Sequence, residues 1–205
     1  MIPYGTFTFF LIAFIVLIPV IILGFLGKRS YIYNGISTAI MIVIIFASDK
    51  HNLLGQKYLS AQLFCFIIYV IWQVALIMYY YQSRQKKNTF TKFVTIMVLS
   101  ILPLAIVKIL QSSWLGGHQI HFHESKLIEF VGFLGISYVT FKSVQLIMEI
   151  RDGSIKEIKV GKLIQFISFF PTISSGPIDR YKRYVKDDKK VPSGAEYREL
   201  VIKAI

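Results

Sequence analysis

Long apolar segments, separated by short polar connections, dominate the chain. Five of them approach or exceed the roughly twenty residues that a helix needs to cross a bilayer. The first is too long for the apolar region of a signal peptide and has no basic residues before it, so it predicts a retained transmembrane helix. The five predicted spans cover residues 4–26, 31–48, 61–81, 89–110 and 127–150. The pattern therefore predicts an all-α integral membrane protein with about five transmembrane helices.

A sixth apolar segment, residues 163–178, has a different pattern. Its apolar part is about thirteen residues long, short of a full crossing, and Pro171, Gly176 and Pro177 interrupt it. Basic residues precede and follow it, and basic flanks favour the cytoplasmic side. We expect a re-entrant element that enters and leaves on that side. An ordinary interfacial loop is the alternative.

The charge of the chain is concentrated in particular connections. The net charge is +12, but the basic residues lie between apolar segments and not along one soluble face, so nucleic acid is not an expected partner. The first, third and fifth connections are strongly basic. The second and fourth carry only Lys50, Lys57 and Lys126. This asymmetry predicts a multi-pass protein of the cell membrane with its N-terminus outside.

The last residues, 193–205, have the pattern of an amphipathic helix. Ser193 and Glu196 form a capping-box pattern that predicts its start. The amphipathic spacing continues to Ile205 without a stop signal, so we expect the sequence to be part of a longer chain. With this segment, residues 1–205 are interpreted as the N-terminal part of one membrane domain.

One face of the fifth predicted span is polar. Tyr138, Lys142, Gln145 and Glu149 recur at helical spacing, so they must face other helices or water. An ionisable side chain inside a span is a functional hypothesis by default, and Lys142 is the deepest of the four. The alternative is a packing network in which Lys142 satisfies backbone carbonyls or a carboxylate.

The metal-ligating residue types do not form a convincing site. His118, His121 and His123 lie close together in a loop, but no helix fixes their geometry, and no metal site is expected. The single cysteine, Cys65, excludes an intrachain disulfide and a cysteine zinc cluster. Phosphate-binding loops and nucleophile–base patterns are not evident in the sequence.

Two motifs resemble the membrane-bound O-acyltransferase family. They are GISYVTF at residues 135–141 and PTISSGPI at residues 171–178. Many relatives carry Gln where this chain has Lys142, and the lysine favours the branch that transfers D-alanyl groups. The resemblance implies a multi-helix bundle with a thinned core and a tunnel between the two membrane sides. Residues expected to line the tunnel or contact substrate are Ser137, Tyr138, Lys142, Gln145, Pro171, Ser175, Gly176, Pro177 and Arg180.

The resemblance also implies a reaction. D-alanine would pass from the phosphopantetheine thioester of a cytoplasmic carrier protein to an extracellular teichoic acid, and no cofactor would bind the chain directly. Implied partners are the D-alanyl carrier protein, the teichoic acid acceptor, anionic lipid and other membrane proteins of the D-alanylation system. The family histidine lies in a later segment, so no catalytic residue is expected in this chain, and the chain alone is expected to be inactive.

Two other functions remain open at this point. A small transporter or flippase subunit would account for the polar stripe and the broken segment equally well. An O-acetyltransferase of another polysaccharide would share the fold and use a different donor.

Overall fold

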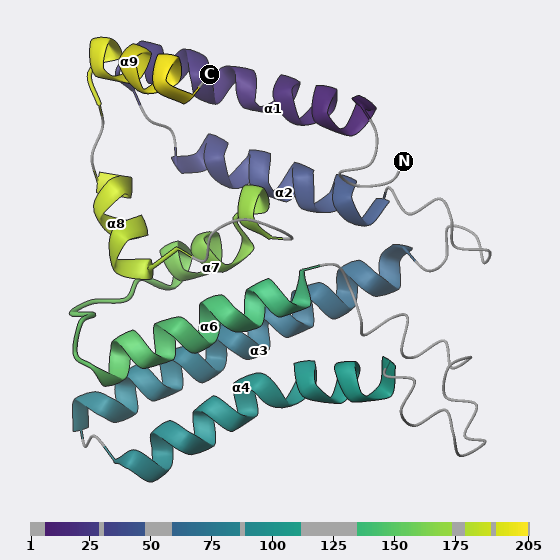
Figure 1. Ribbon diagram of the computed structural model, residues 1–205, viewed down its shortest axis with the longest axis vertical. Helices are drawn as coiled ribbons and strands as arrows, with labels where there is room; N and C mark the ends of the chain where they lie inside the picture. Colours follow the sequence, from purple (N-terminus) through teal and green to yellow (C-terminus); the bar gives the residue numbers. More distant parts are fainter. Residues whose placement is uncertain are drawn as a thin grey trace. The chain divides into compact units, whose positions relative to one another are not determined.

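The computed structural model describes residues 7–28, 31–47, 59–86, 89–111, 135–173, 179–189 and 192–204, and every regular element among them is helical (Figure 1). The predicted all-α class is confirmed. The elements are α1 (Phe7–Phe25), α2 (Tyr31–Ala47), α3 (Leu59–Lys86), α4 (Phe90–Gln111), α6 (Ile136–Arg151), α7 (Val160–Ser168), η3 (Phe170–Thr172), α8 (Tyr181–Lys189) and α9 (Gly194–Ala204).

Three of the described helices have the length and apolar composition to cross a membrane. They cover Phe7–Phe25, Gln62–Lys86 and Phe90–Ile109, and α2 contributes a shorter apolar stretch, Ile32–Phe46. Many of their large apolar side chains are exposed, as lipid contact requires. The chain is a membrane protein. The fifth predicted span, 127–150, is described only from Gly135 onward, so its full length stays a prediction.

The chain forms two compact units, one of residues 1–55 with 183–205 and one of residues 56–182. In the first unit, α1 packs against both α2 and α9. The α9 contact is close, because the ring of Tyr197 lies against Gly24 and meets the ring of Phe25 edge-on at 5.2 Å between centroids.

The predicted capping box at the start of α9 is confirmed. The Ser193 backbone N–H donates to Glu196 Oε2 at 3.0 Å, and the Glu196 N–H donates to Ser193 Oγ at 3.3 Å. Each side chain satisfies a backbone donor that the first helical turn leaves unpaired.

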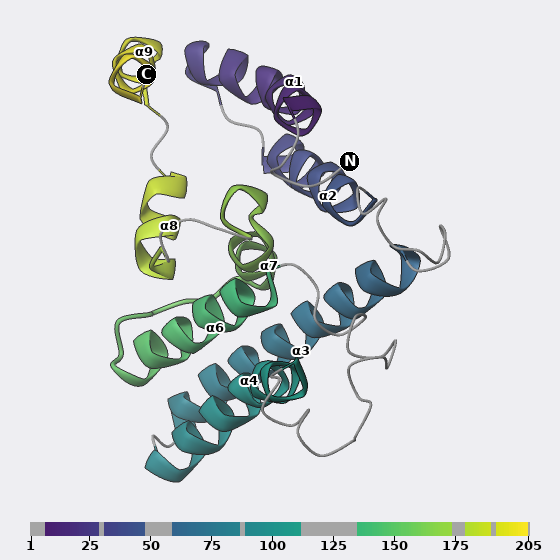
Figure 2. The ribbon, with the colours of Figure 1, turned by 45° about the vertical axis from the view of Figure 1, so that its right-hand side comes forward.

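In the second unit, α3, α4 and α6 pack side by side, and α7 packs on α3 and α6 (Figures 1 and 2). A buried network of hydrogen bonds joins α3, α4 and α6. Gln73 Nε2 donates to Tyr69 Oη at 2.8 Å and to the Ser100 carbonyl at 3.0 Å, and Ser100 Oγ donates to Gln73 Oε1 at 2.7 Å. Tyr69 Oη lies 2.6 Å from Thr140 Oγ1, which donates to the Ile136 carbonyl. Polar bonds of this kind fix the register of helices that lipid alone would not hold together.

The C-terminal end of α6 is closed by a glycine and tied to α3. Gly153 has φ +73°, a left-handed conformation that favours glycine, and the N–H groups of Gly153 and Ser154 bond back to the carbonyls of Ile150 and Glu149. Arg84 Nε donates to the Arg151 carbonyl at 3.2 Å, so the end of α3 holds the end of α6.

Candidate functional site around Lys142

The candidate site lies where α7 ends against α6. Helix α7 has nine residues and stops at Ser168, and the 3-10 turn η3 follows. Pro171 has no backbone N–H, so it cannot donate to the Ile167 carbonyl and the α-helical ladder cannot continue. The short helix and the turn agree with the predicted break in this apolar segment. The predicted re-entrant path relative to a membrane stays a prediction.

Lys142 reaches from α6 into this break. Its side chain is 2% exposed, and Nζ donates to the Phe166 carbonyl at 3.1 Å and to Thr172 Oγ1 at 2.7 Å. The ammonium group also lies 5.5 Å from the centre of the Phe166 ring. The negative charge of Asp179 acts on it as well. A buried cation is costly unless it is hydrogen-bonded, and these groups offset that cost.

Gly135 forms a second contact between α6 and the same segment. It precedes α6 with φ +93°, and a Cβ at this position would lie 2.4 Å from the Ile173 carbonyl oxygen. Gly135 and Lys142 are seven residues apart, so they lie on one face of α6 two turns from each other. Helix α6 therefore holds the segment 166–173 at two points.

The aromatic ring of Phe166 completes the junction. It is 2% exposed and meets the ring of Tyr181, the first residue of α8, edge-on at 5.4 Å between centroids. Phe166 thus accepts a hydrogen bond from Lys142 through its carbonyl, lies with its ring near the Lys142 ammonium group, and packs the same ring on Tyr181.

Six of the nine residues predicted to line a tunnel are described. Lys142 is buried; Ser137, Tyr138 and Gln145 are half-buried; Pro171 and Arg180 are exposed. Ser175, Gly176 and Pro177 lie outside the described residues. The structure brings Lys142 against the segment that contains Pro171. That these residues line a tunnel stays a prediction.

Several residues of this region were not found by sequence reasoning. Thr172 and Asp179, which act on Lys142, were not singled out. Neither were Tyr69, Gln73 and Ser100 of the buried network. Tyr69 and Gln73 are four residues apart inside one predicted span, so the polar spacing that drew attention to Lys142 was present there too.

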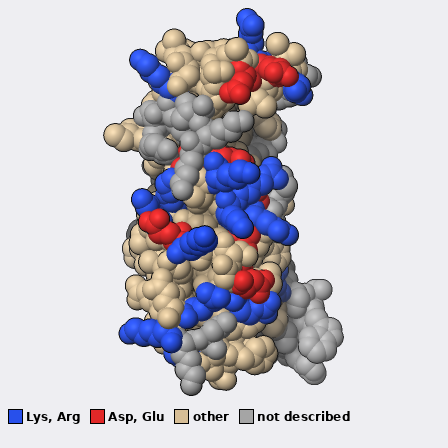
Figure 3. Space-filling model, turned by 90° about the vertical axis from the view of Figure 1, so that its left-hand side faces the viewer, with Lys and Arg blue, Asp and Glu red and all other residues tan. Residues whose placement is uncertain are grey.

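A basic surface covers one end of the second unit. The positive charges of Arg180 and Lys182 interact electrostatically with the carboxyl group of Glu149, near the end of α6. Tyr81 Oη donates to the Lys156 carbonyl at 2.9 Å, which brings the turn after α6 to the end of α3. Lys and Arg predominate on this side (Figure 3). We define the basic end by its exposed cations: Lys86, Lys92, Arg151, Lys156, Lys159, Arg180 and Lys182.

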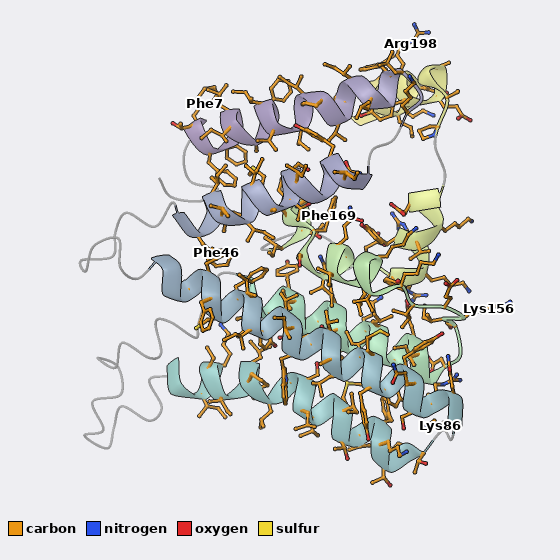
Figure 4. The ribbon with its side chains drawn as sticks, turned by 180° about the vertical axis from the view of Figure 1, so that it is seen from behind. Phe7, Phe46, Lys86, Lys156, Phe169 and Arg198 are labelled. Atoms are coloured by element: carbon orange, nitrogen blue, oxygen red, sulfur yellow. The ribbon has the colours of Figure 1, made fainter. Side chains whose placement is uncertain are left out.

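The junction around Lys142 is set back from the basic end. Figure 4 shows Lys86 and Lys156 together at one end of the second unit and Phe169, between α7 and η3, away from that end. Helix α7 thus starts beside the basic end and runs away from it. Lys142 contacts the opposite, C-terminal end of α7.

The chemical capacity of the described residues is limited. Lys142 donates two hydrogen bonds to the polypeptide. All four histidines, including His118, His121 and His123, lie outside the described residues. Within the described part of the chain, no group of three or more His, Cys, Asp or Glu residues has a metal-binding arrangement.

The chain is similar to proteins named teichoic acid D-alanyltransferase. It is 45% identical over 206 residues to the protein of that name from Bacillus subtilis (strain 168), and 41% identical to the one from Lacticaseibacillus rhamnosus. The identity to the protein from Streptococcus thermophilus (strain ATCC BAA-250 / LMG 18311) is 31%. The alignments cover 100%, 99% and 99% of this chain and 48%, 46% and 44% of these proteins. The chain therefore spans about half the length of the curated relatives it matches. No protein-family model matches it.

Proposed function

We propose that the chain is part of a membrane acyltransferase that transfers D-alanine from a carrier-protein thioester to teichoic acid. The homology to teichoic acid D-alanyltransferases, up to 45% identity over the entire chain, is the observation that carries this proposal. The resemblance of residues 135–141 and 171–178 to the membrane-bound O-acyltransferases agrees with it. A transporter or flippase subunit has no comparable support.

In the proposed reaction, a teichoic acid hydroxyl attacks the D-alanyl thioester carried on phosphopantetheine. The new ester C–O bond forms as the C–S bond breaks, and the hydroxyl proton ends on the departing thiol. Such a step needs a base near the hydroxyl and donors for the developing oxyanion. The described residues contribute the framework: α6 fixes α7 and η3, the segment in which Pro171 lies.

The proposed function is tested in cells by deletion and complementation. In a bacterium that carries the gene, we expect deletion to remove alkali-labile D-alanine from the teichoic acids, and the complete gene on a plasmid to restore it. Unchanged D-alanine ester content after deletion would contradict the proposal. Loss of acetyl esters instead would favour the polysaccharide O-acetyltransferase.

We also propose that the protein crosses the cell membrane several times, with the N-terminus outside and the basic end in the cytoplasm. Single cysteines replacing Lys159 and Lys186, both exposed, are expected to react from the cytoplasmic side in a Cys65→Ala background. A cysteine at Asn52, in the weakly basic second connection, is the control and should react from outside. Reaction of one of these two cysteines from outside would contradict the re-entrant path, and reaction of both from outside would contradict the orientation.

The basic end, continued into α8, is proposed as the docking surface for an acidic carrier protein. Complementary charges accelerate association and make its rate salt-dependent. Replacing Arg180, Lys182 and Arg183 by Gln is expected to slow carrier association about tenfold at low salt and much less at high salt. Stopped-flow measurements with fluorescent carrier protein provide the rates.

The control for carrier docking is Lys203→Gln, which removes a cation of α9 that pairs with Glu199 at 2.7 Å. It should leave association unchanged. If the triple variant associates as fast as the parent, the basic end does not dock the carrier and anionic lipid becomes its proposed partner.

A further inference from the structure

We propose that Lys142 is a positioning residue that caps the C-terminal end of α7 from the neighbouring helix α6. The ammonium group holds α7 and η3 in place and does not itself contact the substrate. The catalytic consequence rests on the proposed acyl transfer.

The first argument is the position of Lys142 at the C-terminal end of α7. The last four carbonyls of any α-helix lack intrahelical donors. Helix α7 ends at Ser168, and Pro171 cannot donate to the Ile167 carbonyl. In this last turn, Lys142 Nζ donates to the Phe166 carbonyl, 3.1 Å away. A cation at this position also interacts favourably with the helix dipole.

The second argument is that the same ammonium group binds the turn after α7. Nζ donates to Thr172 Oγ1 at 2.7 Å, and the Thr172 hydroxyl donates to the Phe169 carbonyl at 3.4 Å. One side chain therefore joins the last turn of α7 to η3 across the break. With the side chain 2% exposed, these bonds direct the ammonium group to the polypeptide.

The third argument is the register between α6 and this segment. Gly135 meets the Ile173 carbonyl two turns before Lys142 on the same face of α6. Because these two contacts lie at different positions along α6, the segment of α7 and η3 can neither slide along α6 nor rotate about it. The position of Pro171, expected on the tunnel wall, then depends on the charge of a residue in another helix.

The inference is tested on the complete protein produced from its gene, with Lys142→Met, Thr172→Val and the double variant. Hydrogen exchange is measured at the amides of residues 163–173. We expect both single variants to accelerate exchange there and not in α3, and the double variant to accelerate it by less than the sum of the two single effects, since each substitution removes the bond between Lys142 and Thr172. Lys156→Met, an exposed cation of the basic end, is the control and should exchange like the parent. Parent-like exchange in Lys142→Met would overturn the inference.

Turnover distinguishes positioning from direct action on the substrate. Normalised to folded protein, kcat should fall about tenfold or more in Lys142→Met with the KM for the carrier unchanged. Thr172→Val, which leaves Lys142 in place, should also lower kcat, and Lys142→Arg should recover much of the activity. Parent-like kcat in Thr172→Val beside an inactive Lys142→Met would overturn the inference. So would an inactive Lys142→Arg with slow exchange, because either result assigns Lys142 to the substrate. A parent without D-alanyl transfer would contradict the proposed function, while the exchange data would still decide the role of Lys142.

Discussion

Gly135→Ala is expected to destabilise the second unit by about 3 kcal/mol. An L side chain is strained at φ +93°, and its Cβ would lie 2.4 Å from the carbonyl oxygen of Ile173. That oxygen belongs to backbone next to η3, so no side-chain rotation relieves the overlap. The substitution therefore pushes the start of α6 away from Ile173 and η3. The free energy of unfolding in mixed detergent micelles measures the cost.

Gly161→Ala is the matched control for that substitution. Gly161 lies in α7, is exposed, and would place its Cβ where no heavy atom lies within 4 Å. Alanine has a higher helix propensity than glycine, so we expect a gain of up to about 1 kcal/mol. Equal effects of the two substitutions would show that the close approach of Gly135 to Ile173 does not exist.

Phe166→Ala is expected to cost about 3–5 kcal/mol of unfolding free energy. The side chain is 2% exposed and packs on Tyr181 and on the Lys142 ammonium group. Its removal leaves a cavity at the junction and withdraws the aromatic face from a buried cation. Thermal and denaturant unfolding of the purified protein provide the measurement.

Phe64→Ala serves as the comparison. Phe64 is 63% exposed on α3, a candidate membrane span, so its loss exchanges contacts with lipid or detergent and leaves no internal cavity. We expect a change within about 1 kcal/mol. A cost for Phe166→Ala as small as that for Phe64→Ala would contradict the packing of α7 described above.

The sequence predicts the helices and their ends well where the signal is local. Hydrophobic length placed α1 to α4 within a few residues, and the capping box at Ser193 and Glu196 formed as expected. The predicted break at Pro171 corresponds to the end of α7. Each of these features depends on residues that are close together in the sequence, so the sequence pattern predicts it directly.

The partners of buried polar residues were not predictable in the same way. The polar spacing singled out Lys142, but its acceptors, Phe166 and Thr172, lie 24 and 30 residues further along the chain. Nothing in the local pattern distinguishes an ammonium group that binds backbone from one that lines a tunnel. The need for a glycine at Gly135 likewise depends on Ile173, in a distant segment.

The central claim, acyl transfer by the protein to which this chain contributes, is tested most directly by reconstitution. The complete gene product is placed in liposomes with lipoteichoic acid and supplied with carrier protein that bears radiolabelled D-alanine on its phosphopantetheine. We expect alkali-labile label to appear on the lipoteichoic acid only when the membrane protein is present. Carrier loaded with acetate should give far less labelled acceptor. Label that stays on the carrier with the protein present, or that crosses the membrane as free D-alanine without forming an ester, would contradict the account.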